Sequence, residues 1–123
     1  MKNISALFIR HLDDLHKEIS SYKNEKDIWK LTGDISNTPG NLCLHICGNL
    51  NFFIGNLIGN NGYVRYRDRE FSDKNVSRAR LLNLINETKN SVADILDKLN
   101  DEDFHKIYPD DRFGEKSTFA YIL

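Results

Sequence analysis

The chain has 123 residues, which is enough for one domain with one hydrophobic core. It carries 17 basic and 18 acidic residues, and the net charge of −1 gives no electrostatic support for binding nucleic acid or an anionic membrane. Its two cysteines do not form the disulfide framework of a secreted protein, and no apolar stretch has the length of a membrane span. We therefore expect residues 1–123 to form a single, soluble, cytoplasmic domain that binds neither nucleic acid nor a membrane.

Residues 4–22 form the first predicted helix, because apolar side chains recur at helical spacing and charged side chains occupy the other side. The apolar members are Ile4, Leu7, Phe8, Leu12, Leu15, Ile19 and Tyr22. His11 falls on this apolar side, so we expect it to point inward, whereas His16 is expected to lie at the rim.

The second predicted helix covers residues 39–58. Asn37 or Thr38 is suited to cap it, and Pro39 suits its first turn. Residues 59–62 contain two glycines and two asparagines and end the helix. Apolar residues surround this helix nearly completely, which is typical of a helix in the middle of a bundle.

The connection that follows, GYVRYRDREFS at residues 62–72, alternates in a period-two pattern and predicts an ordered, extended crossover. A third helix is predicted from residue 77 to residue 99, with Ser77 or Asn75 as its cap. Near the end of the chain, Ser117 and Thr118 have the character of another N-cap before residues 119–123. The expected fold class is all-α: a helical bundle of three long helices plus the stub of a fourth, with a long crossover between helices two and three.

Asn41, His45 and Asn49 follow one another at intervals of four and form a polar seam on the apolar second helix. A buried imidazole needs partners for both ring nitrogens. From these residues alone, His45 is either a core histidine bonded to its neighbours, which is the simpler interpretation, or one ligand of a metal site. Cys43 and Cys47 lie about 200° away around the helix and are interpreted as reduced, small packing residues.

The stretch NTPGNLCLHICGNLNFFIGNLIGNNGYVRYRDREFS, residues 37–72, resembles the motif of a subfamily of the DinB-like superfamily of helical-bundle metalloproteins. This resemblance implies a four-helix bundle, commonly dimeric, that holds a divalent metal, typically zinc or nickel, with three histidines. Some members are thiol-dependent S-transferases or isomerases that use low-molecular-weight thiols. The first metal ligand of the family matches His45, while the other two usually form an HxxxH pair on the fourth helix. This sequence contains no HxxxH and ends about where that helix begins.

The resemblance also covers the arginine-rich crossover. Arg65, Arg67 and Arg69 are therefore candidates for binding an anionic group, such as the carboxylate of a thiol cofactor. The alternative is a loop that is pinned by local pairing of these arginines with nearby acidic residues. Those residues are Asp68, Glu70 and Asp73.

Two hypotheses about function follow. In the first, the protein is a DinB-like, metal-dependent enzyme of the transferase or hydrolase type, with His45 as a metal ligand, His11 as a candidate additional ligand and His105 as a weaker one. In the second, it is a non-catalytic helical protein that forms a homodimer, or binds a partner, through the surface that a fourth helix would cover.

Overall fold

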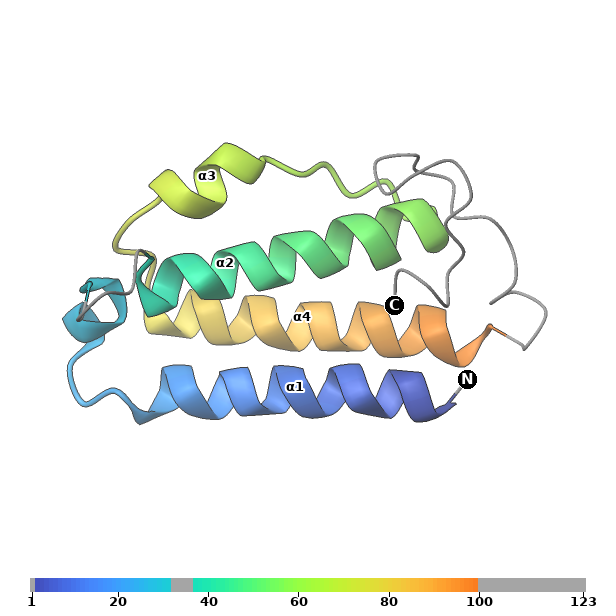
Figure 1. Ribbon diagram of the computed structural model, residues 1–123, viewed down its shortest axis with the longest axis horizontal. Helices are drawn as coiled ribbons and strands as arrows, with labels where there is room; N and C mark the ends of the chain where they lie inside the picture. Colours follow the sequence, from blue (N-terminus) through green and yellow to red (C-terminus); the bar gives the residue numbers. More distant parts are fainter. Residues whose placement is uncertain (1, 32–36, 100–123) are drawn as a thin grey trace.

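A computed structural model of the protein describes residues 2–31 and 37–99, which form an all-helical bundle. Its long elements are α1 (Lys2–Ser21), α2 (Pro39–Leu50) with its continuation η2 (Asn51–Ile58), and α4 (Arg78–Asp97) (Figure 1). Two short helices accompany them: η1 (Glu25–Trp29) and α3 (Arg67–Ser72). The all-α class and the long crossover between the second and third long helices are confirmed.

Two of the expectations from the sequence cannot be compared with the structure. The stub at residues 117–123 and His105 both lie outside the described residues. Within residues 2–31 and 37–99, none of the helices combines the length and the apolar character that crossing a membrane requires.

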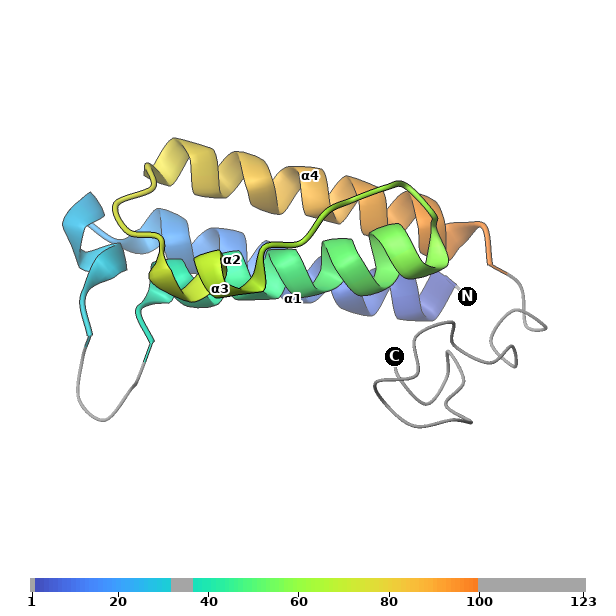
Figure 2. The ribbon, with the colours of Figure 1, turned by 90° about the horizontal axis from the view of Figure 1, so that it is seen from above.

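The main core lies between α1 and α4, which pack along their length and run in opposite directions (Figures 1 and 2). Its largest buried cluster also includes residues of η1 and α2, and consists of Leu12, Leu15, Ile19, Ile28, Cys43, Cys47, Leu81 and Ile85. A second cluster joins Val92 and Leu96 of α4 to Ile54 of η2. Burying one such side chain stabilises the fold by roughly 1.5–3 kcal/mol. The helical spacing of the sequence thus predicted both helices and most of their buried side chains, although Leu7, which it placed on the apolar side of the first helix, is 43% exposed.

The helix starts are fixed by the predicted capping residues. The Oγ1 atom of Thr38 accepts a hydrogen bond from the backbone N–H of Asn41 at 3.1 Å, and Pro39 is the first residue of α2. At the start of α4, Ser77 Oγ accepts from the backbone N–H of Arg80 at 3.2 Å. Each cap satisfies a backbone donor that has no partner within its helix.

The second half of the central helix is wider than an α-helix. From Asn51 to Ile58 it is π-helical, and it ends with the backbone N–H of Gly59 bonded to the carbonyl of Ile54 at 2.9 Å. Bonds that span five residues place more residues in each turn. Side-chain positions in η2 therefore do not follow the 3.6-residue period on which the prediction for residues 39–58 was based.

The crossover differs from the prediction in its second half. We expected an extended segment to residue 72, but residues 67–72 form α3, which lies alongside the first half of α2 (Figure 1). The reason is a tertiary contact: Glu70 is buried against α2 with 7% of its surface exposed. In addition, Asn41 Nδ2 donates to the carbonyls of Glu70 and Asp73 at 3.0 and 2.9 Å, which satisfies acceptors at the end of α3.

Asn41→Ala should lower the free energy of unfolding by about 2–4 kcal/mol, which urea unfolding followed by circular dichroism measures. Asn41 is 1% exposed, and besides the two carbonyls it bonds the hydroxyl of Thr38 and the ammonium group of Lys74. The substitution leaves all of these groups without their partner.

Asn49→Ala is the matched control, because Asn49 is half-buried two turns further along the same helix and makes no side-chain hydrogen bond within the described residues. Its cost should stay below about 1 kcal/mol. Equal losses in the two variants would show that Asn41 does not fix α3 to α2.

Candidate functional site

Three charged or titratable side chains meet between α2 and the crossover. The Arg65 guanidinium donates two hydrogen bonds to the Glu70 carboxylate, from Nε to Oε2 at 2.8 Å and from Nη2 to Oε1 at 2.9 Å. His45 Nδ1 lies 3.1 Å from the same Oε1 atom. Paired bonds between a guanidinium and a carboxylate are strong and directional. We refer to Arg65, Glu70 and His45 as the Arg–Glu–His network.

The network is largely excluded from water. The side chains of Arg65 and Glu70 are 7% and 8% exposed, and that of His45 is 30% exposed. Gly48, one turn after His45, makes the burial of Glu70 possible, because a Cβ atom at this position would overlap its carboxylate. A glycine inside a helix costs about 1 kcal/mol relative to alanine. Here the cost is offset by the close approach of α3.

The Glu70 carboxylate determines which nitrogen of His45 carries the proton. A carboxylate that is paired with arginine accepts hydrogen bonds and does not donate them, so the contact with Oε1 requires an N–H at Nδ1. Arg65 Nη2 lies 3.4 Å from Nδ1, but both atoms are then donors and form no bond with each other. In the neutral imidazole, Nε2 carries the lone pair that can accept a proton or bind a metal ion.

Two phenylalanine rings contact side chains of the Arg–Glu–His network. The ring of Phe71 lies 4.9 Å from that of His45, measured between centroids. The guanidinium of Arg67 lies 5.4 Å from the centroid of Phe71, and that of Arg65 lies 6.0 Å from the centroid of Phe53. These stacking and cation–π contacts restrict the rotation of the imidazole and of the buried guanidinium.

The three arginines of the crossover occupy different surroundings. Arg65 is buried on Glu70, and Arg67 stacks on a phenylalanine. Arg69 has 69% of its side chain exposed, and its Nε lies 3.7 Å from the carboxylate of Asp73. The local pairing with Glu70 and Asp73, which was the alternative interpretation of the sequence, is therefore present for two of the three. Anion binding by these arginines stays a prediction.

Two of the three residues of the polar seam contact α3, and the third does not. Asn41 and His45 both face α3, where one binds its backbone and the other binds Glu70. Asn49 is half-buried and takes no part in the network. The inward orientation expected for His11 is wrong: it is exposed on α1 and borders a groove that α2 also lines, because the turn of the helix buries Leu12 instead. Its role as a ligand stays a prediction.

The described donors do not gather into a complete metal site. Within residues 2–31 and 37–99, no three histidine, cysteine or carboxylate side chains come close enough to hold a metal ion. Cys43 and Cys47 are free and fully buried, as expected for packing residues. A hydrogen bond with Cys47, followed by burial, raises the pKa of Cys43, so this thiol is kept in its neutral form.

Sequence reasoning missed the central roles of Glu70 and Gly48. It grouped Glu70 with two other acidic residues as a local partner of the arginines, and it assigned no particular contact to Gly48. One signal was available: Gly48 lies three residues after His45, on the same side of the helix. A glycine beside a histidine on such a face leaves room for a group that contacts the imidazole.

The fold and the site define a helical-bundle protein with a buried Arg–Glu–His network beside its central helix. Residues 2–109 match the model of a family described as "Protein of unknown function (DUF1572)", and the chain therefore belongs to this family. Comparisons with curated proteins and with solved structures gave no match.

Glu70→Gln should lower the free energy of unfolding by about 3 kcal/mol, because it leaves the buried guanidinium of Arg65 without a counter-charge. Urea unfolding measures the loss. Asp68→Asn is the matched control, since Asp68 is exposed on the same short helix, and it should change stability by no more than about 0.5 kcal/mol. A Glu70→Gln protein that is as stable as this control would contradict a structural role for the buried ion pair.

Proposed function

We propose that the protein is a DinB-like helical bundle of the metal-dependent transferase or hydrolase type, in which His45 is a metal ligand. The observation that carries this proposal is the hydrogen bond from His45 Nδ1 to Glu70. Histidines that bind metals nearly always donate their other ring N–H to a carboxylate, a carbonyl or water, which fixes the tautomer and the orientation of the ring. All three residues of the network also lie within the motif that resembles the DinB-like superfamily.

The Arg–Glu–His network supplies one ligand of the proposed metal site, which is His45. A catalytic zinc site ordinarily uses three protein ligands, and Glu70 is engaged by Arg65 and His45. The further ligands would come from His11, from residues outside 2–31 and 37–99, where His105 lies, or from a second chain. Zinc or nickel would supply a Lewis acid, and a small thiol is the substrate that the resemblance implies. A cytoplasmic location belongs to the same proposal.

Each residue of the network has a definite task in this proposal. His45 offers Nε2, Glu70 keeps the proton on Nδ1, and Arg65 holds the carboxylate in place with two hydrogen bonds. Because His45 belongs to α2 and Glu70 to α3, the direction of Nε2 depends on how these two helices pack.

The metal content of the full chain, purified without chelators and measured by elemental mass spectrometry, tests the proposal. We expect bound zinc or nickel in the wild type and its loss in His45→Ala. Glu70→Gln should weaken binding by about 10-fold to 100-fold, because the imidazole loses the negatively charged acceptor that orients it and raises its basicity. His16→Ala is the matched control. This variant should keep its metal, because His16 is a half-buried histidine on α1 that takes no part in the Arg–Glu–His network. A wild type without metal, or metal that persists in His45→Ala, would contradict the proposal.

A second candidate function is self-association through the side of the bundle where α1 and α2 meet. A groove of about 270 Å³ lies there and is bordered by apolar residues of both helices: Phe8, Leu12, Leu15, Ile46 and Leu50. Ile46 and Leu42 share one face of α2 and remain 39% and 38% exposed. Exposed apolar patches of this kind mark interaction surfaces, and a second copy of the chain is the partner that the second hypothesis names.

Sedimentation equilibrium tests this candidate. The wild type should form a homodimer, and Ile46→Lys should weaken it because a charge would be placed in an apolar contact. Val64→Lys is the control, since Val64 is 64% exposed on the crossover, away from this groove. A wild type that stays monomeric at about 100 μM, where even weak dimers are populated, would exclude a dimer of functional strength.

A further inference from the structure

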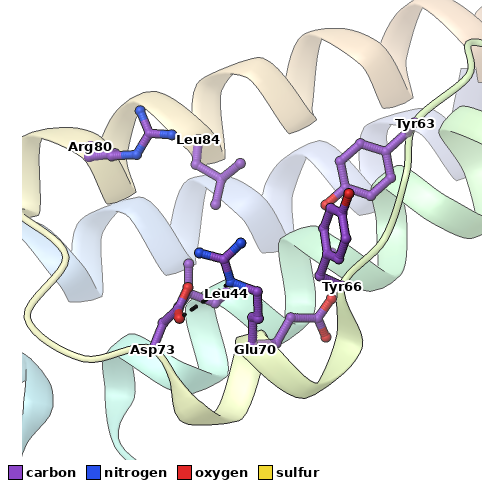
Figure 3. A pocket seen from close by; sticks show the side chains of 9 residues that line it. Leu44, Tyr63, Tyr66, Glu70, Asp73, Arg80 and Leu84 are labelled. Carbon is purple, nitrogen blue, oxygen red and sulfur yellow. Dashed lines mark ion pairs between the residues drawn. The ribbon is translucent and has the colours of Figure 1, made fainter.

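A cavity of about 260 Å³ lies between α2, α4, α3 and the crossover (Figure 3). Its lining combines apolar, aromatic and cationic side chains from these elements: Leu44, Leu84, Tyr63, Tyr66, Arg69 and Arg80. Glu70 borders the cavity as well, whereas His45 does not. The cavity is therefore separate from the imidazole of the network, although the two share one carboxylate.

Two cationic and two acidic side chains line this cavity, and one of the acidic side chains is neutralised by an arginine that does not line it. The charge of Glu70 is balanced by Arg65, which lies behind it. The Oδ1 atom of Asp73 lies 3.7 Å from Nε of Arg69, and this distance is too long for a hydrogen bond. The guanidinium of Arg80 has neither an ion-pair partner nor a hydrogen-bond acceptor among the described residues. Figure 3 shows Arg80 on α4, across the cavity from Asp73.

The uncharged part of the lining suits an apolar group. Leu44 of α2 and Leu84 of α4 both line the cavity, and Figure 3 shows Leu84 extending from α4 toward α2. Tyr66 is 63% exposed, and the guanidinium of Arg69 lies 5.9 Å from its ring centroid. Burial, followed by the charge of Glu70, raises the pKa of Tyr63. Its hydroxyl, like that of any tyrosine near neutral pH, is protonated and can donate a hydrogen bond to a ligand.

We propose that this cavity binds a small organic monocarboxylate with an aromatic or aliphatic body. The carboxylate would be held by the guanidinium of Arg80, with Arg69 as a second positive charge, and the body would lie against Leu44 and Leu84. Guanidinium groups bind carboxylates through paired hydrogen bonds. Asp73 disfavours a ligand with two negative charges, and the volume is below the usual range for drug-sized ligands. This binding is independent of any metal at His45 and goes beyond the proposed function.

An NMR titration of the ¹⁵N-labelled full chain with phenylacetate tests the proposal, with a chelator present so that metal binding plays no part. We expect saturable shifts for residues that line the cavity and a dissociation constant of about 1 mM, as is usual for so small a ligand. Phenylacetamide, which has the same shape without the charge, should bind at least about tenfold more weakly.

The variants separate this site from general charge attraction. Arg80→Gln should weaken binding by about tenfold, and Asp73→Asn should strengthen it because a repelling charge is removed. Arg67→Gln is the matched control: Arg67 lies on α3 like Arg69 but does not line the cavity, so the affinity should not change. The amide spectrum of each variant reports whether it is folded, and Arg69→Gln replaces Arg80→Gln if the latter does not fold.

Three results would overturn the proposal. They are the absence of saturable binding of phenylacetate, equal affinity for phenylacetamide, and unchanged binding by the Arg80→Gln or Arg69→Gln protein. Inorganic phosphate that binds at the same residues more tightly than phenylacetate would overturn the assignment to a monocarboxylate.

Discussion

The buried ion pair between Arg65 and Glu70 is the interaction on which the rest of the site depends. A carboxylate with so little exposed surface is tolerated only when its acceptors are filled, and here a guanidinium and an imidazole fill them. The same pair requires a residue without a side chain at position 48, because nothing larger leaves space for the carboxylate. The requirements of one buried charge thus link the glycine, the fold of the crossover and the tautomer of His45.

α3 is held on α2 by two kinds of contact. The side chain of Glu70 joins the network, while its backbone carbonyl is bound by Asn41, one turn of α2 before His45. A short helix of six residues has little stability of its own, so these contacts decide that it forms. The orientation of the imidazole is consequently a property of the tertiary fold, and both proposed binding functions use surfaces that adjoin the same carboxylate.

The sequence predicted the long helices because their signals are local. Amphipathic spacing and caps such as Thr38 and Ser77 depend only on neighbouring residues, and the observed starts agree with them. The fold of residues 67–72 could not be predicted in this way, because alternating charges are compatible with a strand or a helix and a distant contact decides. His45 was singled out by its place in the polar seam of an apolar helix, and the family resemblance then favoured it as a candidate ligand. The contact of His45 with Glu70 was missed because it joins residues that lie 25 positions apart in the sequence.

The route of the crossover also bears on the order in which the protein folds. After η2 the chain turns back along its own helix: Asn56 bonds the carbonyl of Tyr63, seven residues on, and the network joins residues 25 apart. The contacts of α1 with α4 join residues much further apart, such as Lys89 and Asp13, which are separated by 76 positions. Because closing a longer loop costs more chain entropy, the central helix and its crossover can assemble as a local unit. The imidazole and its carboxylate partner would then be in place before α1 and α4 close the core.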